Sequence, residues 1–287
     1  MENCPICSEQ FFVEELEYHF IDCFENQIKK EDVYKESKPV EFTYEQKMAL
    51  AFSYKKSKLY SKNVFDNLVL RFLNFGYKKE DIKKVQNYVK NHSQIIIHFS
   101  PLLLDKFLND TNYRNGFEIG RDSNYLKSRI TWETNLFNRI YDNVKDGSNR
   151  VKYGVLNITN CLEGVKSCYS YGDSYFVLKK DIKKRSTFVF GDSSIMDIHI
   201  ATFKHFNSIL LYMNDGDFKN LVDHVLNCFN YNEMDLKGPE YKGSYIEVQI
   251  HGPIRFNQDI DRIVLNPTHY NTNYEVQTNK FVEKNLI

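Results

Sequence analysis

The sequence has no long apolar run and no excess of charge of either sign. No stretch of about 18 apolar residues, the length that an α-helix needs to cross a bilayer, occurs in the chain. The N-terminus lacks a basic segment followed by an apolar run, so we expect no signal peptide. Lysine plus arginine and aspartate plus glutamate each total 38, so no global field draws the protein to nucleic acid or to an anionic membrane. We therefore expect a cytoplasmic protein, in a host cytosol if it is a secreted effector, with local patches for recognition.

Several catalytic signatures are also missing. The sequence contains no glycine-rich phosphate loop, no paired metal-binding carboxylates and no Ser-His-Asp order, which disfavours a kinase, a nuclease or a hydrolase. It contains no internal repeat. With 287 residues, of which 42% are hydrophobic and 15% aromatic, the chain can form one sizeable core plus a small appendage.

Cysteine is sparse outside the N-terminus. Of the six cysteines, three lie in one N-terminal cluster and the others are Cys161, Cys168 and Cys228. These three lack the spacing of a disulfide framework, and no neighbouring residue marks an activated thiolate. We expect them to be reduced, buried and chemically inert.

The N-terminal cluster has the spacing of a zinc site. Two cysteines separated by two residues are followed, after eleven residues, by a histidine and a cysteine separated by three. This pattern places a two-cysteine knuckle opposite two ligands one helical turn apart, so that all four can bind one ion. The alternative is a chance cluster of redox-active thiols. The predicted Zn²⁺ ligands, in a small ββα-type finger at 1–26, are Cys4, Cys7, His19 and Cys23.

The charges around these ligands are all of one sign. Residues 1–26 contain seven acidic residues and no lysine or arginine, a composition that repels nucleic-acid phosphates. The solvent side of the predicted helix carries Tyr18 and Ile21 beside Asp22, an apolar spot with an acidic rim. A protein surface with an apolar centre and a basic rim would complement it.

The finger also resembles a known family. Its segments CPICSEQF and LEYHFIDCF are similar to the ubiquitin-binding zinc fingers of autophagy adaptors and DNA-repair proteins. The resemblance covers the whole finger and implies that it binds ubiquitin or a ubiquitylated protein, with Tyr18, Ile21 and Asp22 as contacts. A finger that merely caps the chain is the alternative.

The rest of the chain divides into a linker and two further regions. Residues 27–40 mix charges with Ser37 and Pro39 and have no apolar period, which indicates a linker. Residues 41–92 carry apolar side chains at three- and four-residue steps, which predicts two or three helices. Residues 93–287 alternate short strand-like runs with helical ones, so we expect an α+β domain with a mixed or antiparallel sheet.

The elements of this larger domain can be placed by their patterns. Runs of β-branched and aromatic residues predict strands at Ile95–Phe99, Tyr153–Ile158, Tyr175–Leu178, Thr187–Phe190 and Tyr245–His251. Apolar residues at helical steps predict helices at Leu102–Leu108, Thr131–Tyr141 and Phe218–Phe229.

Two of these strands carry polar side chains in suggestive positions. The run Tyr245–His251 alternates strictly, which puts Glu247 and Gln249 on the face opposite its three apolar residues. That polar face either lines a cleft or is an ordinary solvated face. His98 ends an apolar run shortly before Pro101 and is either a site residue or a structural histidine.

The order of motifs in this region resembles an uncharacterised, mainly bacterial domain family. From residue 94 to 267 the chain carries HF before a proline, then YRNGFEIG, WETNLF, KYGVLNI, YGDSYFVL, RSTFVFGDS and YIEVQIHGP. The His98 strand and the Glu247 strand also look like the first and third motifs of the mono-ADP-ribosyltransferase fold. That fold is a split mixed sheet that binds nicotinamide adenine dinucleotide (NAD).

The second resemblance implies a role for each matching residue. Glu247 would bond the ribose hydroxyl and face the cation that develops when nicotinamide leaves. His98 would hold the adenosine-side ribose, and Gln249 would position the acceptor nucleophile. The implied NAD contacts, by ring stacking or by binding of the pyrophosphate, are His98, Tyr113, Arg114, Tyr175, Phe176 and Arg185.

Together the two resemblances imply an NAD-dependent mono-ADP-ribosyltransferase that modifies ubiquitin or a ubiquitylated protein. The finger would recruit the substrate and raise its effective concentration at the catalytic domain. A non-catalytic ubiquitin-binding module with a transferase-like fold is the first alternative. A nucleic-acid transferase is the second, and the acidic finger disfavours it.

The division into finger and catalytic domain can be tested with the variant Cys7→Ser. Loss of one Zn²⁺ ligand removes much of the folding free energy of so short a unit, so we expect the finger to unfold and to release zinc. Intrinsic NAD cleavage by the larger domain should stay close to the wild-type rate. Zinc content and nicotinamide release measure this, and loss of both together would show that the division is wrong.

Overall fold

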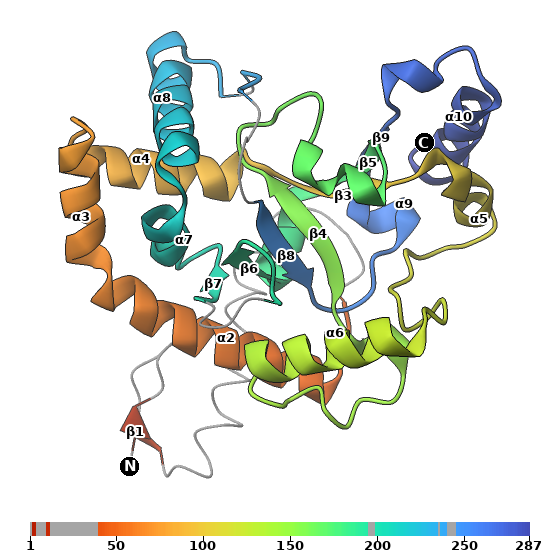
Figure 1. Cartoon of the computed structure of the whole chain (residues 1–287), viewed down its shortest axis with the longest axis horizontal. Coiled ribbons are helices and arrows are strands. Elements are labelled where there is room, and N and C mark those ends of the chain that lie inside the picture. The colour runs from red at the N-terminus through yellow and green to blue at the C-terminus, as the bar shows by residue number, and fades with distance from the viewer. Residues whose placement is uncertain (1, 4–9, 12–39, 195–198, 235, 240–244) are drawn as a thin grey trace.

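The structure is a computed structural model that describes residues 2–3, 10–11, 40–194, 199–234, 236–239 and 245–287. Within these ranges the chain forms a seven-stranded sheet with helices packed around it (Figure 1). The α+β class expected from the sequence is therefore confirmed.

The strands of the sheet follow the order β7-β6-β8-β4-β3-β5-β9, and every neighbouring pair of these strands is antiparallel. Of the mixed or antiparallel sheet expected from the sequence, the described strands form the antiparallel one, and the split mixed sheet implied by the transferase resemblance is not found among them, although an isolated parallel bridge joins Gly191 to Ile246. The direction in which a strand returns depends on its connection and is not encoded in the strand's own residues. The strands are β3 (Gln94–Phe99), β4 (Lys152–Asn157), β5 (Ser174–Leu178), β6 (Ser186–Phe190), β7 (Ala201–Thr202), β8 (Ile246–Ile250) and β9 (Ile260–Val264).

The five strands predicted from the sequence are confirmed as β3, β4, β5, β6 and β8, with ends that differ by one residue at most. Two strands were not predicted. β7 is only two residues long, and β9 lies at the edge of the sheet with Asp261 and Arg262 exposed. Short and edge strands lack the apolar pattern that identifies a buried strand.

The helices surround the sheet, and none among the described residues is long and apolar enough to cross a membrane. The two or three helices expected at 41–92 are confirmed as three. The α-helices are α2 (Tyr44–Asn63), α3 (Phe65–Asn74), α4 (Lys79–Asn91), α5 (Leu104–Leu108), α6 (Ser123–Leu136), α7 (Asn207–Tyr212), α8 (Asp215–Tyr231), α9 (Phe256–Asp259) and α10 (Asn273–Asn285). Short 3-10 helices are η1 (Pro101–Leu103), η2 (Gly147–Asn149), η3 (Lys166–Tyr171), η4 (Lys180–Arg185) and η5 (Pro267–His269).

Helix α6 differs most from the sequence prediction, which was Thr131–Tyr141. It begins after Asp122, whose carboxylate accepts hydrogen bonds from two backbone N–H groups of the first turn. It ends before Asn138 and Arg139, which both have positive φ angles that an α-helix excludes. The helix therefore begins eight residues before the predicted start and ends five residues before the predicted end.

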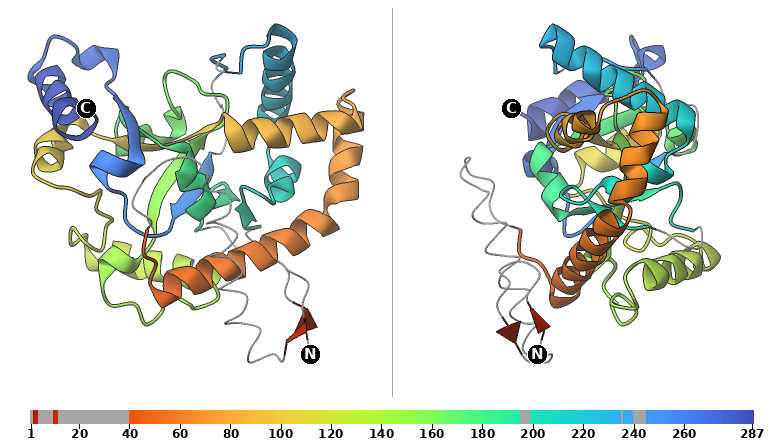
Figure 2. Two further views of the ribbon diagram at one scale, coloured as in Figure 1. Left: turned by 180° about the vertical axis from the view of Figure 1, so that it is seen from behind. Right: turned by 90° about the vertical axis from the view of Figure 1, so that its left-hand side faces the viewer.

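Helices α2, α3 and α4 belong to the same folded unit as the sheet. In Figure 1 they form a bracket around the left of the sheet, with α4 at the top, α3 at the left and α2 at the bottom, and Figure 2 shows the same arrangement from behind and from the side. The Ser57 hydroxyl lies 3.1 Å from that of Thr202 on β7, and Asn207 donates to the carbonyl of Ser61. Arg71 of α3 donates to the carbonyl of Leu210 at 2.8 Å. These buried polar contacts join the helical segment to the larger domain.

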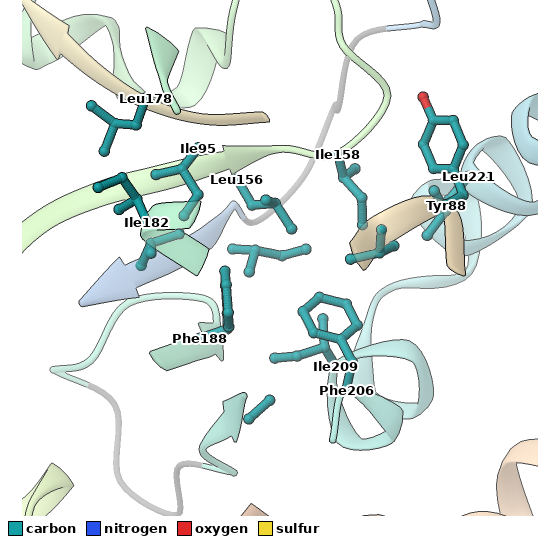
Figure 3. Packing of buried hydrophobic residues seen from close by; sticks show 14 of the residues in the cluster. Tyr88, Ile95, Leu156, Ile158, Leu178, Ile182, Phe188, Phe206, Ile209 and Leu221 are labelled. Carbon is teal, nitrogen blue, oxygen red and sulfur yellow. The ribbon is translucent and has the colours of Figure 1, made fainter. Parts of the chain in front are cut away.

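One face of the sheet carries the main hydrophobic core. Successive side chains of a strand point to opposite faces, so alternate residues of every strand meet on this side. Figure 3 shows the central part of this packing between the sheet and helices α4, α7 and α8. The core includes Tyr88, Ile95, Leu156, Ile158, Phe176, Leu178, Ile182, Phe188, Phe206, Ile209, Leu221, Ile246, Val248 and Ile250.

The opposite face of the sheet is mixed in character. A smaller apolar cluster there includes Ile96, Val155 and Tyr175. Beside it stand the polar residues Glu247 and Gln249, which alternate with the core residues of β8. Helix α6 approaches this side of the sheet in Figure 1. Glu247 and Gln249 therefore lie on the face opposite the main core.

The three scattered cysteines are confirmed as buried, and they form no disulfide with one another. Burial raises the pKa of the Cys168 thiol to about 12, so this side chain is protonated at neutral pH. A protonated thiol is a poor nucleophile.

The predicted zinc ligands and ubiquitin contacts all lie outside the described residues, so the finger stays a prediction. What the structure describes there is an antiparallel pair, β1 (Glu2–Asn3) with β2 (Gln10–Phe11). This pair brackets residues 4–9, which contain two of the four predicted ligands. Elsewhere, within the described ranges, no group of His, Cys, Asp and Glu is arranged to hold a metal ion.

Phe176 provides a test of the core. Its ring is fully buried and tilted against that of Phe99, with 4.6 Å between the ring centroids, and Phe256 and Phe281 are also in contact. We expect Phe176→Ala to lower the free energy of unfolding by about 3 to 5 kcal/mol, because it removes buried area and leaves a cavity. Phe229 is 39% exposed, so Phe229→Ala should cost about 0.5 kcal/mol. Equal losses for the two variants in urea unfolding would contradict this assignment of the core.

Candidate functional site

A pocket opens on the polar face of the sheet beside helix α6. Its cavity volume is about 130 Å³, and it opens to solvent. Glu247 of β8 and His98 of β3 both line it. Five tyrosines and three arginines line it as well, namely Tyr113, Tyr125, Tyr153, Tyr171, Tyr245, Arg114, Arg121 and Arg129.

Strand β4 sets the spacing of the two residues that the sequence singled out. It lies between β8 and β3, so that Glu247 stands opposite Val155 and Val155 stands opposite Ile96. Residues directly opposite each other share a face. His98 follows Ile96 by two residues and is therefore on that face too. The fold thus brings Glu247 and His98 to one pocket.

Glu247 is a nearly buried carboxylate, with 4% of its surface exposed. Its Oε1 accepts a hydrogen bond from the Gln249 amide at 2.8 Å. Its Oε2 lies 4.0 Å from Nη1 of Arg129. Burial raises the pKa of Glu247 above its ordinary value, and the nearby Ser193 hydroxyl and the positive charge of Arg129 oppose that rise. One oxygen is therefore held within the strand, while the other faces a cation at the pocket.

Arg129 of α6 is held by aromatic rings. Its guanidinium lies 3.9 Å from the centre of the Tyr153 ring, and its Nε donates to the Tyr125 hydroxyl at 3.1 Å. The residue is 5% exposed, and its Nη1 has no hydrogen-bond partner among the described residues. A buried donor without a partner is unusual in native structures. Arg129 therefore has bonding capacity directed at the pocket and at Glu247.

A second buried ion pair, between Glu133 and Arg150, supports the tyrosine ring that Arg129 contacts. Glu133, one helical turn after Arg129, accepts from Nη1 of Arg150 at 2.6 Å and from the Tyr153 hydroxyl at 3.2 Å. Burial raises the pKa of Glu133, and the charge of Arg150 opposes the rise. Removing one partner of such a buried pair leaves an uncompensated charge. The pair fixes the ring on which Arg129 stacks.

The remaining wall of the pocket is aromatic and basic. Tyr245 donates its hydroxyl to Asp192 at 2.7 Å, and burial raises the pKa of Tyr113 to about 12. Both are therefore neutral phenols at physiological pH. Arg114 is half exposed and pairs with Asp110. Tyrosine rings stack on flat heterocycles and guanidinium groups bind phosphate oxygens, so this wall suits an aromatic, anionic ligand.

His98 lines the pocket but has both ring nitrogens occupied. Its Nδ1–H donates to the Gly172 carbonyl at 2.9 Å, and its Nε2 accepts from the Val165 backbone N–H at 3.1 Å. Burial lowers the pKa of His98 to about 4, so the ring is neutral. The expected ribose contact therefore has no free nitrogen in this arrangement. The structural interpretation of this histidine fits better, because the ring fastens the loop that contains η3 to strand β3.

Gln249 does not reach the pocket. It is fully buried, donates to Glu247 and accepts from the Thr187 hydroxyl at 2.9 Å. Its expected role in positioning the acceptor nucleophile is therefore wrong. It supports the carboxylate instead of contacting a substrate.

Three of the predicted NAD contacts lie away from the pocket. Phe176 is on the core face of β5, because it follows Tyr175 and consecutive strand residues point to opposite faces. Tyr175 donates its hydroxyl to the Leu162 carbonyl at 2.8 Å and so supports the η3 loop. Arg185 is buried, where it donates to the carbonyl of His251. Tyr113 and Arg114, the other two residues of that set beside His98, line the pocket.

Residues 92–287 match a family that is described as a protein of unknown function, DUF3626. The match covers about two thirds of the 287 residues. The chain belongs to the DUF3626 family. No curated protein matches it. Every residue that lines the pocket lies in the DUF3626 region, whereas helices α2, α3 and α4 all precede it.

The sequence did not single out several pocket residues of the DUF3626 domain, above all Arg129. It lies just before the motif WETNLF, in a stretch that was expected to precede the helix. With the helix beginning after Asp122, Arg129 and Glu133 fall on one face at a four-residue spacing. The four-residue spacing of Arg129 and Glu133 becomes a signal only when Asp122 is identified as the N-cap of α6.

The neutral His98 should make the stability of the DUF3626 domain depend on pH. An unfolded histidine has a pKa near 6.5 and the folded one has a pKa of about 4. The unfolded state therefore binds more protons between these values, so stability is present above about pH 6.5 and is lost as the pH falls toward 4. We expect His98 to contribute a loss of about 2 kcal/mol between pH 7 and pH 5.

The comparison variant is His98→Gln, whose amide keeps one donor and one acceptor but does not titrate. Urea unfolding of both proteins at pH 7 and pH 5 gives the two losses. The wild type should lose more than the variant by the amount stated above. Equal losses would mean that His98 is already accessible to protons in the folded protein.

Proposed function

We propose that the protein is an NAD-dependent mono-ADP-ribosyltransferase. The observation that carries the proposal is the single nearly buried carboxylate, Glu247, facing a pocket of tyrosines and arginines on the polar side of the sheet. The β3 and β8 strands that the sequence likens to the first and third transferase motifs both contribute to that pocket.

The proposed reaction requires a negative charge beside the ribose carbon from which nicotinamide leaves. When nicotinamide leaves, the bond from the ribose carbon to the ring nitrogen breaks, and positive charge develops on the ribose. A fixed carboxylate beside that carbon stabilises the charge more in the transition state than in the ground state. Oε2 of Glu247 would do this, because Oε1 is already bonded to Gln249. The acceptor nucleophile then bonds the ribose carbon and releases its proton.

The pocket wall supplies the contacts that a dinucleotide needs. Tyr113, Tyr171 and Tyr245 would stack on the nicotinamide or adenine rings. Arg114 and Arg121 would bind the pyrophosphate oxygens. We leave Arg185, Phe176 and Tyr175 out of the proposed contacts because they do not line the pocket.

The proposed acceptor is ubiquitin or a ubiquitylated protein, recruited by a Zn²⁺-binding finger at 1–26. The ligand spacing of Cys4, Cys7, His19 and Cys23 supports this part of the proposal, as does the strand pair that brackets residues 4–9. The acidic rim and apolar spot of the finger suit a basic-rimmed protein partner and disfavour nucleic acid. Recruitment would raise the local substrate concentration without tight contacts to the catalytic domain.

A non-catalytic ubiquitin-binding module is the second candidate. The observation in its favour is that both ring nitrogens of His98 bond to backbone groups, so the ribose contact implied by the transferase resemblance has no free atom. Such a protein would bind ubiquitin without cleaving NAD.

The test is to incubate the full chain with labelled NAD and ubiquitin and to measure nicotinamide release and protein labelling. We expect Glu247→Gln, which keeps the shape but removes the charge, to lower both rates by about 100- to 1,000-fold. The matched control is Glu283→Gln, because Glu283 is exposed on α10, and this variant should behave as wild type.

The other outcomes discriminate between the alternatives. Absence of label and of nicotinamide release in the wild type, together with ubiquitin binding, would favour the non-catalytic module. Label on oligonucleotides but not on proteins would favour a nucleic-acid transferase. Equal activity of wild type and Glu247→Gln would exclude Glu247 as the catalytic carboxylate.

A further inference from the structure

We propose that Thr187 is a positioning residue that acts on Glu247 through Gln249. The relay holds Oε1 of the Glu247 carboxylate in a hydrogen bond, so that Oε2 is the oxygen that faces the substrate. The Thr187 hydroxyl donates to Oε1 of Gln249 at 2.9 Å. The Gln249 amide nitrogen then donates to Oε1 of Glu247 at 2.8 Å. The inference deepens the proposed function and, in its kinetic part, rests on it.

The direction of this relay is fixed by chemistry. An ionised carboxylate only accepts hydrogen bonds, so the NH2 end of the Gln249 amide must face Glu247. The carbonyl end then needs a donor on its other side, and the Thr187 hydroxyl is that donor. If the Gln249 amide were flipped, its carbonyl oxygen would face the Glu247 carboxylate. Both are acceptors, so no hydrogen bond would form between them.

The strand register holds the three side chains in one row. Thr187 of β6 stands directly opposite Gln249 of β8, and Val189 stands opposite Glu247. All these residues therefore share one face. Thr187 and Gln249 are 0% exposed, so water does not substitute for the threonine hydroxyl. The valines opposite Glu247 on β6 and β4 offer its carboxylate no hydrogen bond.

The relay leaves the second oxygen of Glu247 facing the pocket. Oε2 lies 4.0 Å from the otherwise unpartnered Nη1 of Arg129. Loss of the Gln249 bond would destabilise the ionised carboxylate and let it rotate away from this direction. The titratable and charged groups around Glu247, from every element that packs against it, are Arg129, Tyr153, Cys168, Tyr171, Asp192 and Tyr245.

Thr187 and Gln249 do not line the pocket. A change at Thr187 should therefore alter the carboxylate without altering ligand contacts. This separates a positioning role from a binding role, because the rate of the chemical step falls while the affinity for NAD is retained.

The decisive variant is Thr187→Val, which keeps the branched shape but removes the hydroxyl. We expect kcat for NAD cleavage to fall about tenfold at pH 7, with KM for NAD within about twofold of wild type. The acidic limb of the pH profile should move to higher pH, because the Glu247 carboxylate is harder to ionise without an oriented amide. Thr187→Ser restores the donor and should recover the wild-type rate and profile.

A second measurement does not depend on catalysis. The ¹³C signal of the Glu247 carboxyl in the free protein, assigned through its loss in Glu247→Gln, titrates with the ionisation of this group. Its midpoint should be higher in Thr187→Val than in wild type and unchanged in Thr187→Ser. If Thr187→Val does not fold, Thr187→Cys, whose thiol is a weaker donor, takes its place and should shift the midpoint in the same direction.

The outcomes separate the two proposals. If the wild type does not cleave NAD but the carboxyl midpoint moves as described, the proposed function fails and the positioning role stands. If the wild type cleaves NAD and Thr187→Val matches it in kcat, pH profile and carboxyl midpoint, the positioning role is overturned. A rise in KM with kcat unchanged would also overturn it, since that result assigns Thr187 to ligand binding.

Discussion

The site depends on one negative charge that is almost removed from water. A buried carboxylate is costly unless it is hydrogen-bonded and faces an opposite charge. At Glu247 the hydrogen bond comes from Gln249 and the charge from Arg129. Arg129 in turn stacks on Tyr153, whose hydroxyl is bonded to Glu133. Side chains of β4, β6, β8 and α6 are therefore arranged around a single carboxylate. A substitution in any of these side chains is expected to change the ionisation of Glu247.

The two faces of the sheet have different roles: one forms the main core and the other lines the pocket. One face buries a continuous apolar core against helices α4, α7 and α8 (Figure 3). The other face holds the polar groups, under helix α6 and the loop that His98 fastens. A site built on packed strands keeps its side chains in narrow orientations, which a carboxylate that stabilises developing charge requires. Helices α2 and α3 extend the same unit through contacts with β7 and α7.

The sequence predicted the elements of the DUF3626 domain better than the neighbourhoods of its side chains. Strict alternation placed Glu247 on the polar face, and the structure agrees. The same rule, applied to β5, would have excluded Phe176 once Tyr175 was assigned to the polar face, because neighbours in a strand point apart. His98 was correctly placed at the site, but the two backbone partners of its ring come from the loop after β4 and leave no mark in the strand itself.

By itself the sequence determined the five main strands, the face on which each residue of β8 lies, the buried state of the three scattered cysteines and the spacing from which zinc binding is predicted. These features follow from periods and spacings that each segment carries in its own backbone geometry. Only the tertiary structure decided that β4 lies between β3 and β8, that all strand pairs are antiparallel, and that Arg129 reaches Glu247. Such contacts join segments far apart in the chain, and they are selected by the burial of the whole core and not by any local pattern.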